Sequence, residues 1–213
     1  METRATKIHS SINKNAIIRV IPGHFATNHS HINYYVDMTI MKCRKSEAAA
    51  AAAVLARKYS TSTYIDTIIC MDGCEVIGAY LADELSASGI RSMNQHKTMY
   101  VVTPEMNPGG QLIFRDNMQM MINGKHCLLL LASATTGRTI ARALECIQYY
   151  GGIVAGVSAI FSASKEVNGV EVFSIFGEED LKGYETYSAS KCPMCANNQK
   201  IDAIVNSFGY SKL

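Results

Sequence analysis

CLLLLASATTGRTIARALECIQYYGGIVAG, residues 127–156, predicts a strand, a loop, a helix and the start of a second strand. The continuous apolar run Cys127–Ala132 is too short to cross a membrane and is typical of a strand that is buried on both faces. From Ile140 onward, apolar residues recur at helical spacing until Gly151-Gly152 ends the helix. A further apolar run completes a βαβ unit.

The loop between this strand and this helix is rich in small hydroxyl residues. It leads directly into a helix N-terminus, where free backbone N–H groups and the positive end of the helix dipole favour an anion. The alternative is an ordinary turn whose threonine hydroxyls only cap the helix. We interpret the loop as a site for a phosphate monoester, formed by Ser133, Ala134, Thr135, Thr136, Gly137, Arg138 and Thr139.

This arrangement resembles the type I phosphoribosyltransferases. In that family a buried strand is followed by two adjacent acidic residues, two variable positions, a Thr-Thr-Gly sequence and a helix. Thr135-Thr136-Gly137 matches the Thr-Thr-Gly, whereas Leu131 and Ala132 occupy the acidic positions. The resemblance implies a 5′-phosphate site on a motif that has lost its carboxylates.

The N-terminal region resembles the orotate phosphoribosyltransferases, through Gly23, Phe25, Tyr34, Tyr35 and Asp37. The resemblance places Tyr34 and Tyr35 over the base, although ordinary strand packing is an equal alternative. We expect a turn at Pro22-Gly23, and we expect the nearby histidines to be surface polar residues. These are His24, His29 and His31.

A second loop, Asp72-Gly73-Cys74, follows another buried strand, and the resemblance makes it the pyrophosphate loop. Asp72 and Glu75 would repel a diphosphate unless a metal lay between them, so a turn residue and a helix N-terminal charge are the favoured interpretation. An active enzyme would need Mg²⁺, and Asp72, Glu75 and Asp116 are the acids that could replace the missing pair.

Residues 104–126 form a long connection, which in a compact domain is usually functional or mobile. In orotate phosphoribosyltransferases the matching segment is a mobile catalytic loop that contains lysines. Here the entry has no base, and alternating apolar residues around Arg115-Asp116-Asn117 predict a β-hairpin instead.

Cys192-Pro-Met-Cys195 is half of a structural zinc site, because such sites use four ligands. The missing pair could be chosen from Cys74, His96, His126 or a symmetry-related chain, and reduced thiols without a role remain an alternative. After the knuckle we expect a helix, capped by Asn197 or Asn198 and ended by Gly209. Its apolar face would contain Ile201, Ile204, Val205 and Phe208.

The expected fold is α/β, with a twisted and mainly parallel sheet flanked by helices and a small N-terminal hood. The predicted parts are a hood segment (1–40), a phosphoribosyltransferase-like core (41–178) and a C-terminal knuckle with its helix (179–213). An alanine-rich stretch predicts a helix over 46–59 with Ser46 as N-cap.

Composition restricts the partners. The chain has 213 residues, a net charge of +2 and seven cysteines, and it lacks a long basic run or an apolar stretch of about 20 residues. We therefore expect a cytoplasmic protein with reduced thiols that binds neither nucleic acid nor membrane. The family resemblance also implies that the protein forms a homodimer.

Two functional hypotheses remain. In the first, the protein binds a nucleotide or phosphoribosyl pyrophosphate with weak or no transferase activity. In the second, it is an active phosphoribosyltransferase for orotate or a related base that uses substitute ligands for the metal and the ribose.

Overall fold

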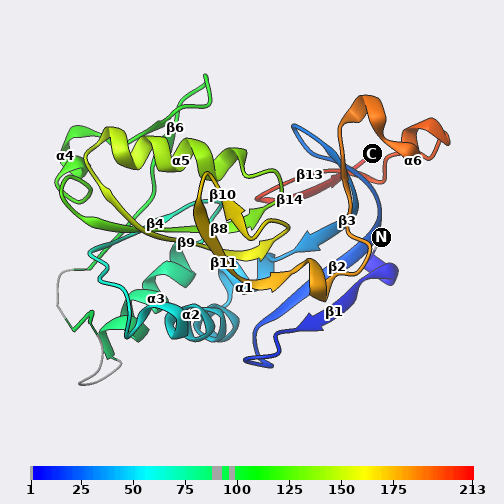
Figure 1. The fold of residues 1–213 in the computed structure, drawn as a ribbon. Helices are drawn as coiled ribbons and strands as arrows, with labels where there is room; N and C mark the ends of the chain where they lie inside the picture. Colours follow the sequence, from blue (N-terminus) through cyan, green and yellow to red (C-terminus); the bar gives the residue numbers. More distant parts are fainter. Residues whose placement is uncertain (1, 88–92, 96–98) are drawn as a thin grey trace.

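The computed structural model describes residues 2–87, 93–95 and 99–213. Two six-stranded sheets lie side by side: a core sheet that is sandwiched by helices, and a hood sheet built from both ends of the chain (Figure 1). The chain begins and ends on the hood.

The core sheet has the strand order β10-β11-β9-β8-β4-β5. Neighbours from β11 to β5 are parallel, and only β10 pairs antiparallel within it. The α/β fold class with a mainly parallel sheet is therefore confirmed. Its strands are β4 (Thr67–Cys70), β5 (Tyr100–Val102), β8 (His126–Ala134), β9 (Ile153–Ser162), β10 (Glu166–Val167) and β11 (Val170–Gly177).

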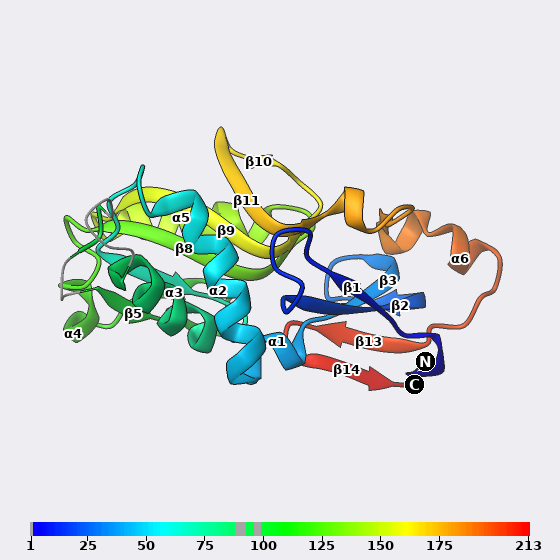
Figure 2. The same ribbon diagram turned by 90° about the horizontal axis from the view of Figure 1, so that it is seen from below.

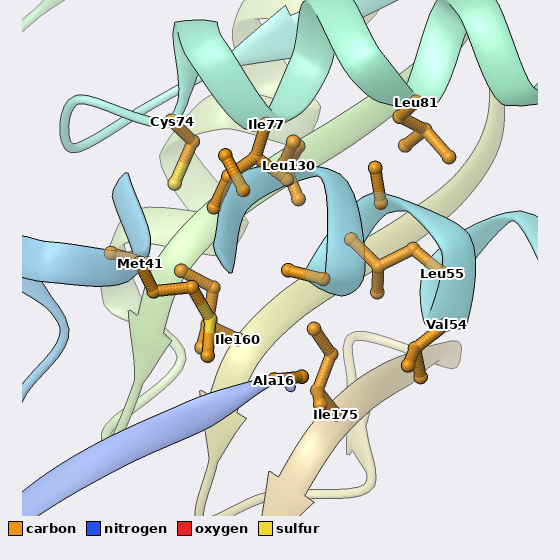
Figure 3. Packing of buried hydrophobic residues seen from close by; sticks show 14 of the residues in the cluster. Ala16, Met41, Val54, Leu55, Cys74, Ile77, Leu81, Leu130, Ile160 and Ile175 are labelled. Carbon is orange, nitrogen blue, oxygen red and sulfur yellow. The ribbon is translucent and has the colours of Figure 1, made fainter. Parts of the chain in front are cut away.

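Helices cover both faces of the core sheet. Helices α2 (Lys45–Tyr59) and α3 (Glu75–Ala87) pack on one face, and α5 (Arg138–Tyr149) packs on the other (Figure 1). Successive residues of β8 alternate between the two hydrophobic clusters, so that Leu130 faces α2 and α3 whereas Leu131 faces α5. Figure 3 shows the cluster beneath α2 and α3, where Leu130 lies close to Ile77. This alternation explains why β8 reads as a continuous apolar run.

The hood sheet has the order β12-β3-β2-β13-β14, and β1 also pairs with β2. Strand β13 pairs parallel with β2, while the other pairs are antiparallel. Both chain ends therefore contribute to one sheet (Figure 2). Its strands are β1 (Thr6–His9), β2 (Ile17–Ala26), β3 (His31–Asp37), β12 (Thr186–Tyr187), β13 (Ala203–Asn206) and β14 (Gly209–Lys212).

The expected C-terminal helix is wrong, because this segment forms the β13–β14 hairpin. Of the residues expected on its buried face, Ile204 is 49% exposed and Phe208 is 81% exposed. The alternating burial of β13 places Ala203 and Val205 inside instead. Tertiary pairing with β2 thus overrides a helical pattern that the residues also satisfy.

The hairpin expected around Arg115-Asp116-Asn117 is also displaced. Strands β6 (Glu105–Met106) and β7 (Leu112–Ile113) pair with each other, and helix α4 (Asp116–Gln119) replaces the expected turn. The remaining short elements are η1 (Glu2–Arg4), α1 (Thr39–Cys43), η3 (Glu178–Asp180), η4 (Ala189–Lys191) and α6 (Pro193–Ala196).

Two local expectations fail for related reasons. Pro22-Gly23 is not a turn: β2 continues through it as an irregularity in its pairing with β3. Ser46 does not cap α2, which begins at Lys45 with Arg44 as its N-cap residue. Strand β2 thus extends past its expected end, and helix α2 has already begun before its expected N-cap residue.

Among the helices that the structure describes, none has both the length and the apolar character needed to span a membrane.

Candidate functional site

A cavity of about 690 Å³ opens between the core and the hood. The core contributes the loop after β8 and the loop after β4 to its lining, and the hood contributes parts of β3 and the β13–β14 turn. The position at the carboxyl ends of parallel strands is where α/β folds bind ligands.

The end of β8, the loop after it and the start of α5 bring all seven residues of the predicted phosphate site, Ser133 to Thr139, to the cavity wall. Gly137 is the N-cap residue of α5 with φ 70°, a left-handed conformation that favours glycine. A Cβ atom there would lie 2.8 Å from Cγ2 of Val167. The loop is therefore held in a shape that no other residue fits without movement.

This loop offers unused hydrogen-bond donors. The first helical hydrogen bond runs from the N–H of Ala141 to the carbonyl of Gly137. The N–H groups of residues 138–140 have no acceptor in the described part of the chain, nor do the hydroxyls of Thr135, Thr136 and Thr139 have a partner there. Together with the positive end of α5, these donors suit a phosphate group.

The two positions where the family pattern has carboxylates are apolar and enclosed. Leu131 is 0% exposed and packs on the α5 side of the sheet, and Ala132 is 1% exposed and packs on the opposite side. Neither residue lines the cavity. The strand that leads into the predicted phosphate site thus provides no carboxylate at these two positions.

Asp72 and Gly73 also line the cavity, whereas Cys74 is buried in the core and does not reach it. Both Asp72 (φ 58°) and Gly73 (φ 78°) have left-handed backbones. Burial raises the pKa of Asp72, although Lys42, the Ser207 side chain and the backbone N–H of Ala132 act in the opposite direction. The Asp72 carboxylate therefore lies next to one of the two positions that lack an acid.

The paired tyrosines of β3 occupy different environments. Both line the cavity, but Tyr34 is half-buried while Tyr35 is mostly enclosed within the hood. Tyr35 packs against Phe25 and Tyr210, with ring centroids 6.0 Å and 5.6 Å away, and burial raises the pKa of its hydroxyl to about 12. Tyr34 is therefore the more accessible of the two from the cavity, and Tyr35 also packs within the hood.

Among the described residues, one lysine and two arginines line the cavity, namely Lys42, Arg138 and Arg142. Sequence reasoning missed Lys42 and Arg142. Lys42 is buried, and its ammonium group donates hydrogen bonds to the carbonyls of Asp72, at 2.8 Å, and Ser207. A lone lysine in a short helix carries no sequence signal, because its role depends on two loops that are distant in the chain. The Asn206–Phe208 turn was missed for the same reason.

The long connection over 104–126 reaches the cavity through Pro104, Met106 and Leu112. Its arginine, Arg115, does not line the cavity and instead pairs with Glu105 at 2.7 Å. Asp116 also lies outside the cavity lining, and its carboxylate accepts a hydrogen bond from Gln119. The connection therefore supplies no cation to the cavity wall.

Cys192 and Cys195 lie in the hood and do not line this cavity. The expected surface role of two nearby histidines is wrong: His24 and His31 are buried, and their ring nitrogens meet the two sulfurs. Only His29 of the three is exposed. Of the partners considered from sequence, Cys74 is enclosed in the core and His126 pairs with Asp66, whereas His96 lies outside the described residues.

Comparisons with known proteins agree with this architecture. No protein-family model matches the chain, and no curated protein matches its sequence. Solved structures do match in fold. Orotate phosphoribosyltransferase from Mycobacterium tuberculosis H37Rv, solved with Fe(III) dicitrate, has a TM-score of 0.51 at 17% identity, over 76% of this chain and 91% of that chain.

Two further structures are similar. Adenine phosphoribosyltransferase from Thermoanaerobacter pseudethanolicus has a TM-score of 0.51 at 16% identity, over 83% of this chain and 96% of that one. The Mycobacterium tuberculosis orotate phosphoribosyltransferase in complex with 5-phospho-alpha-D-ribosyl 1-diphosphate has a TM-score of 0.50 at 16% identity. The match covers 69% of this chain and 82% of that chain. This chain therefore has the type I phosphoribosyltransferase fold, as its sequence resemblance predicted.

Proposed function

We propose that this protein binds a 5′-phosphorylated ribose compound, a nucleotide or phosphoribosyl pyrophosphate, and that its transferase activity is weak or lost. The phosphate group would occupy the loop of residues 133–139 at the N-terminus of α5. Tyr34 and Tyr35 would lie beside the base, and the Asp72-Gly73 loop would face a diphosphate. Crystals of a protein with the same fold contain phosphoribosyl pyrophosphate, which supports this class of ligand.

The observation that carries the proposal is a contrast along a single strand and its loop. The loop presents unused N–H and hydroxyl donors to the cavity, while Leu131 and Ala132 are enclosed in the core. Displacement of pyrophosphate needs carboxylates that hold the ribose hydroxyls and order Mg²⁺, and cations that stabilise charge on the leaving group. The strand supplies none of the carboxylates, and the 104–126 connection supplies none of the cations.

An active phosphoribosyltransferase is the second candidate, and one observation favours it. Asp72 and Glu75 both line the cavity, and the Asp72 carboxylate lies beside the backbone of Ala132. Mg²⁺ held there could replace part of the missing site. Glu75 accepts a hydrogen bond from Thr103 at 2.9 Å, so its carboxylate already has a partner.

Calorimetric titration of orotidine 5′-phosphate and phosphoribosyl pyrophosphate, with and without Mg²⁺, separates these candidates when it is combined with a chromatographic turnover assay. We expect Mg²⁺-independent nucleotide binding without product. Thr136→Val, which keeps the side-chain shape and removes the hydroxyl, should weaken nucleotide binding about tenfold. Thr61→Val is the matched control, because Thr61 is an exposed threonine in a turn outside the cavity lining.

Mg²⁺-dependent formation of orotidine 5′-phosphate would replace the first candidate with the second. Equal affinities of the Thr136→Val and wild-type proteins would place the phosphate elsewhere. No binding of either compound would contradict both candidates.

A further inference from the structure

Four metal-binding side chains converge in the hood, outside the lining of the cavity. His24 comes from β2, His31 from the start of β3, and Cys192 and Cys195 from the knuckle at α6. One ligand atom of each lies within 4.8 Å of the ligand atoms of all the others. Residues from two distant parts of the sequence therefore form a single cluster.

The separations within this cluster fit a tetrahedral ion. The Nε2 atom of His24 is 3.6 Å from the Sγ atoms of both cysteines, and Nδ1 of His31 is 3.3 Å from Sγ of Cys195. Zinc–sulfur and zinc–nitrogen bonds of about 2.3 Å and about 2.05 Å at tetrahedral angles put sulfur and nitrogen about 3.6 Å apart. The two ring nitrogens are 2.9 Å apart, somewhat closer than the roughly 3.3 Å of such a site.

The second nitrogen of His24 has a partner that suits a metal ligand. Its Nδ1 lies 2.9 Å from the backbone carbonyl of Gln199, which can only accept a hydrogen bond. The proton of a neutral imidazole is then on Nδ1, and Nε2 directs a lone pair into the cluster. Such an outer hydrogen bond to a carbonyl is typical of metal-bound histidines.

The composition and burial of the cluster indicate which metal it suits. Two thiolates and two imidazoles in a tetrahedral arrangement favour zinc, and a complete set of four protein ligands indicates a structural site. His24 and Cys192 are buried, while Cys195 is at the surface. None of the four residues lines the cavity.

We propose that His24, His31, Cys192 and Cys195 bind one structural Zn²⁺, which fastens the C-terminal segment to the β2–β3 hairpin of the hood. The hood has its own hydrophobic cluster, and this cluster is small: its buried members are Ile21, Phe25, Ile32, Tyr35, Ala203 and Val205. Small cores of this kind commonly depend on a metal or on disulfides.

The same ion connects the knuckle to a segment that reaches the cavity wall. Strand β13 follows the knuckle and pairs with β2 through Ala203 with Phe25 and Ile204 with Ala26, directly after His24. Asp202, just before β13, accepts a hydrogen bond from the backbone N–H of His24 at 2.9 Å. The turn after β13 then lines the cavity. Zinc at the knuckle thus fixes the segment that positions this turn.

Metal analysis of protein purified without chelators tests the assignment. We expect one zinc per chain in the wild type, and at least a tenfold lower zinc content in Cys195→Ser and in His31→Ala, roughly the loss that removal of a ligand produces. The matched controls are Cys43→Ser and His29→Ala, which change an exposed cysteine and an exposed histidine outside the cluster. Both controls should keep their zinc.

Two measurements on the wild-type chain avoid reliance on variants that fold poorly. Cobalt substitution should give the visible absorption of a tetrahedral dithiolate site. After chelation, hydrogen exchange in residues 199–212 should accelerate at least about tenfold while that of β8 stays unchanged. Neither measurement involves the cavity ligand, so each is independent of the proposed function.

Several results would overturn the proposal. The first is a wild-type protein that neither contains nor takes up zinc, and the second is a site that holds iron or copper instead of zinc. The others are a Cys192–Cys195 disulfide in the purified protein and full zinc content in Cys195→Ser. Unchanged exchange of residues 199–212 after zinc removal would overturn its role in fastening the C-terminal segment.

Discussion

The phosphate loop and the C-terminal segment are both short stretches at the cavity wall, but they are specified in different ways. The loop of residues 133–139 is set by its immediate neighbours in the chain: a buried strand before it and a helix after it. The β13–β14 hairpin depends on β2, which lies far away in the sequence. Local patterns therefore predicted the strand–loop–helix structure of the first correctly and misread the second.

The difference shows where evidence from sequence is strong. An apolar run, a small-residue loop and an amphipathic helix reinforce one another, because each limits what the next can be. In the C-terminal segment, Ile201, Ile204, Val205 and Phe208 fit a helical period, whereas Ala203 and Val205 fit a strand. Only an open edge on β2 decides between them.

The largest expected effect would come from a carboxylate at the first apolar position of the motif. Leu131→Asp should lower the free energy of unfolding by about 3–5 kcal/mol, because it places an unpaired charge in a fully enclosed site. Urea unfolding measures the change. Leu131→Met, which nearly conserves volume, is the control and should cost less than about 1.5 kcal/mol. A stable Leu131→Asp protein with Mg²⁺-dependent turnover would show that this position belongs to the site rather than to the core.

The next effect tests the shape of the phosphate loop. Gly137→Val should weaken binding of orotidine 5′-phosphate at least about 30-fold, because a β-branched residue resists the left-handed conformation and moves the N–H donors. Calorimetric titration measures the affinity. Gly169→Val is the matched control: Gly169 has φ 78°, but nothing lies within 4 Å of the added Cβ. Similar losses of affinity in both variants would assign the effect to general strain instead of the loop.

A smaller effect tests the hairpin. The Asn206 side-chain oxygen accepts hydrogen bonds from the N–H groups of Phe208 at 2.8 Å and Gly209 at 3.1 Å. Asn206→Ala should therefore lower the free energy of unfolding by about 1 kcal/mol, as measured in urea. Asn197→Ala is the control and should leave the free energy of unfolding unchanged. If the segment were instead a helix capped by Asn197, Asn197→Ala would be the more destabilising of the two variants.

The smallest effect concerns the junction between the two regions, where Asp72 and Ser207 both contact Lys42. Burial raises the pKa of folded Asp72 above its ordinary value of 3.8, so ionisation destabilises the fold. The stability of the wild type relative to Asp72→Asn should be highest below that value and should fall as the pH rises through the raised pKa. Asparagine also tolerates the left-handed backbone of this position. Urea unfolding of both proteins at several pH values measures the difference, and a difference that grows with pH would contradict the prediction.

Much of the core could be predicted from sequence, and much of the hood could not. The strand before the phosphate loop, the helix after it and the alanine-rich helix all form at about their expected positions. Lys42 escaped prediction because its two acceptors come from separate loops. The histidine partners of the knuckle escaped because isolated histidines beside serine and asparagine resemble surface residues.

The sequence by itself determined the βαβ unit, the loop that we propose as a phosphate site and the apolar residues where carboxylates were expected. Each of these depends on consecutive residues, whose hydrogen bonds and side-chain directions are set by local geometry. Tertiary structure alone decided that the C-terminal segment is a hairpin, that Lys42 reaches the cavity, and that His24 and His31 meet Cys192 and Cys195. These features join residues from distant parts of the chain, and their positions depend on which strand edges and buried surfaces the rest of the fold leaves open.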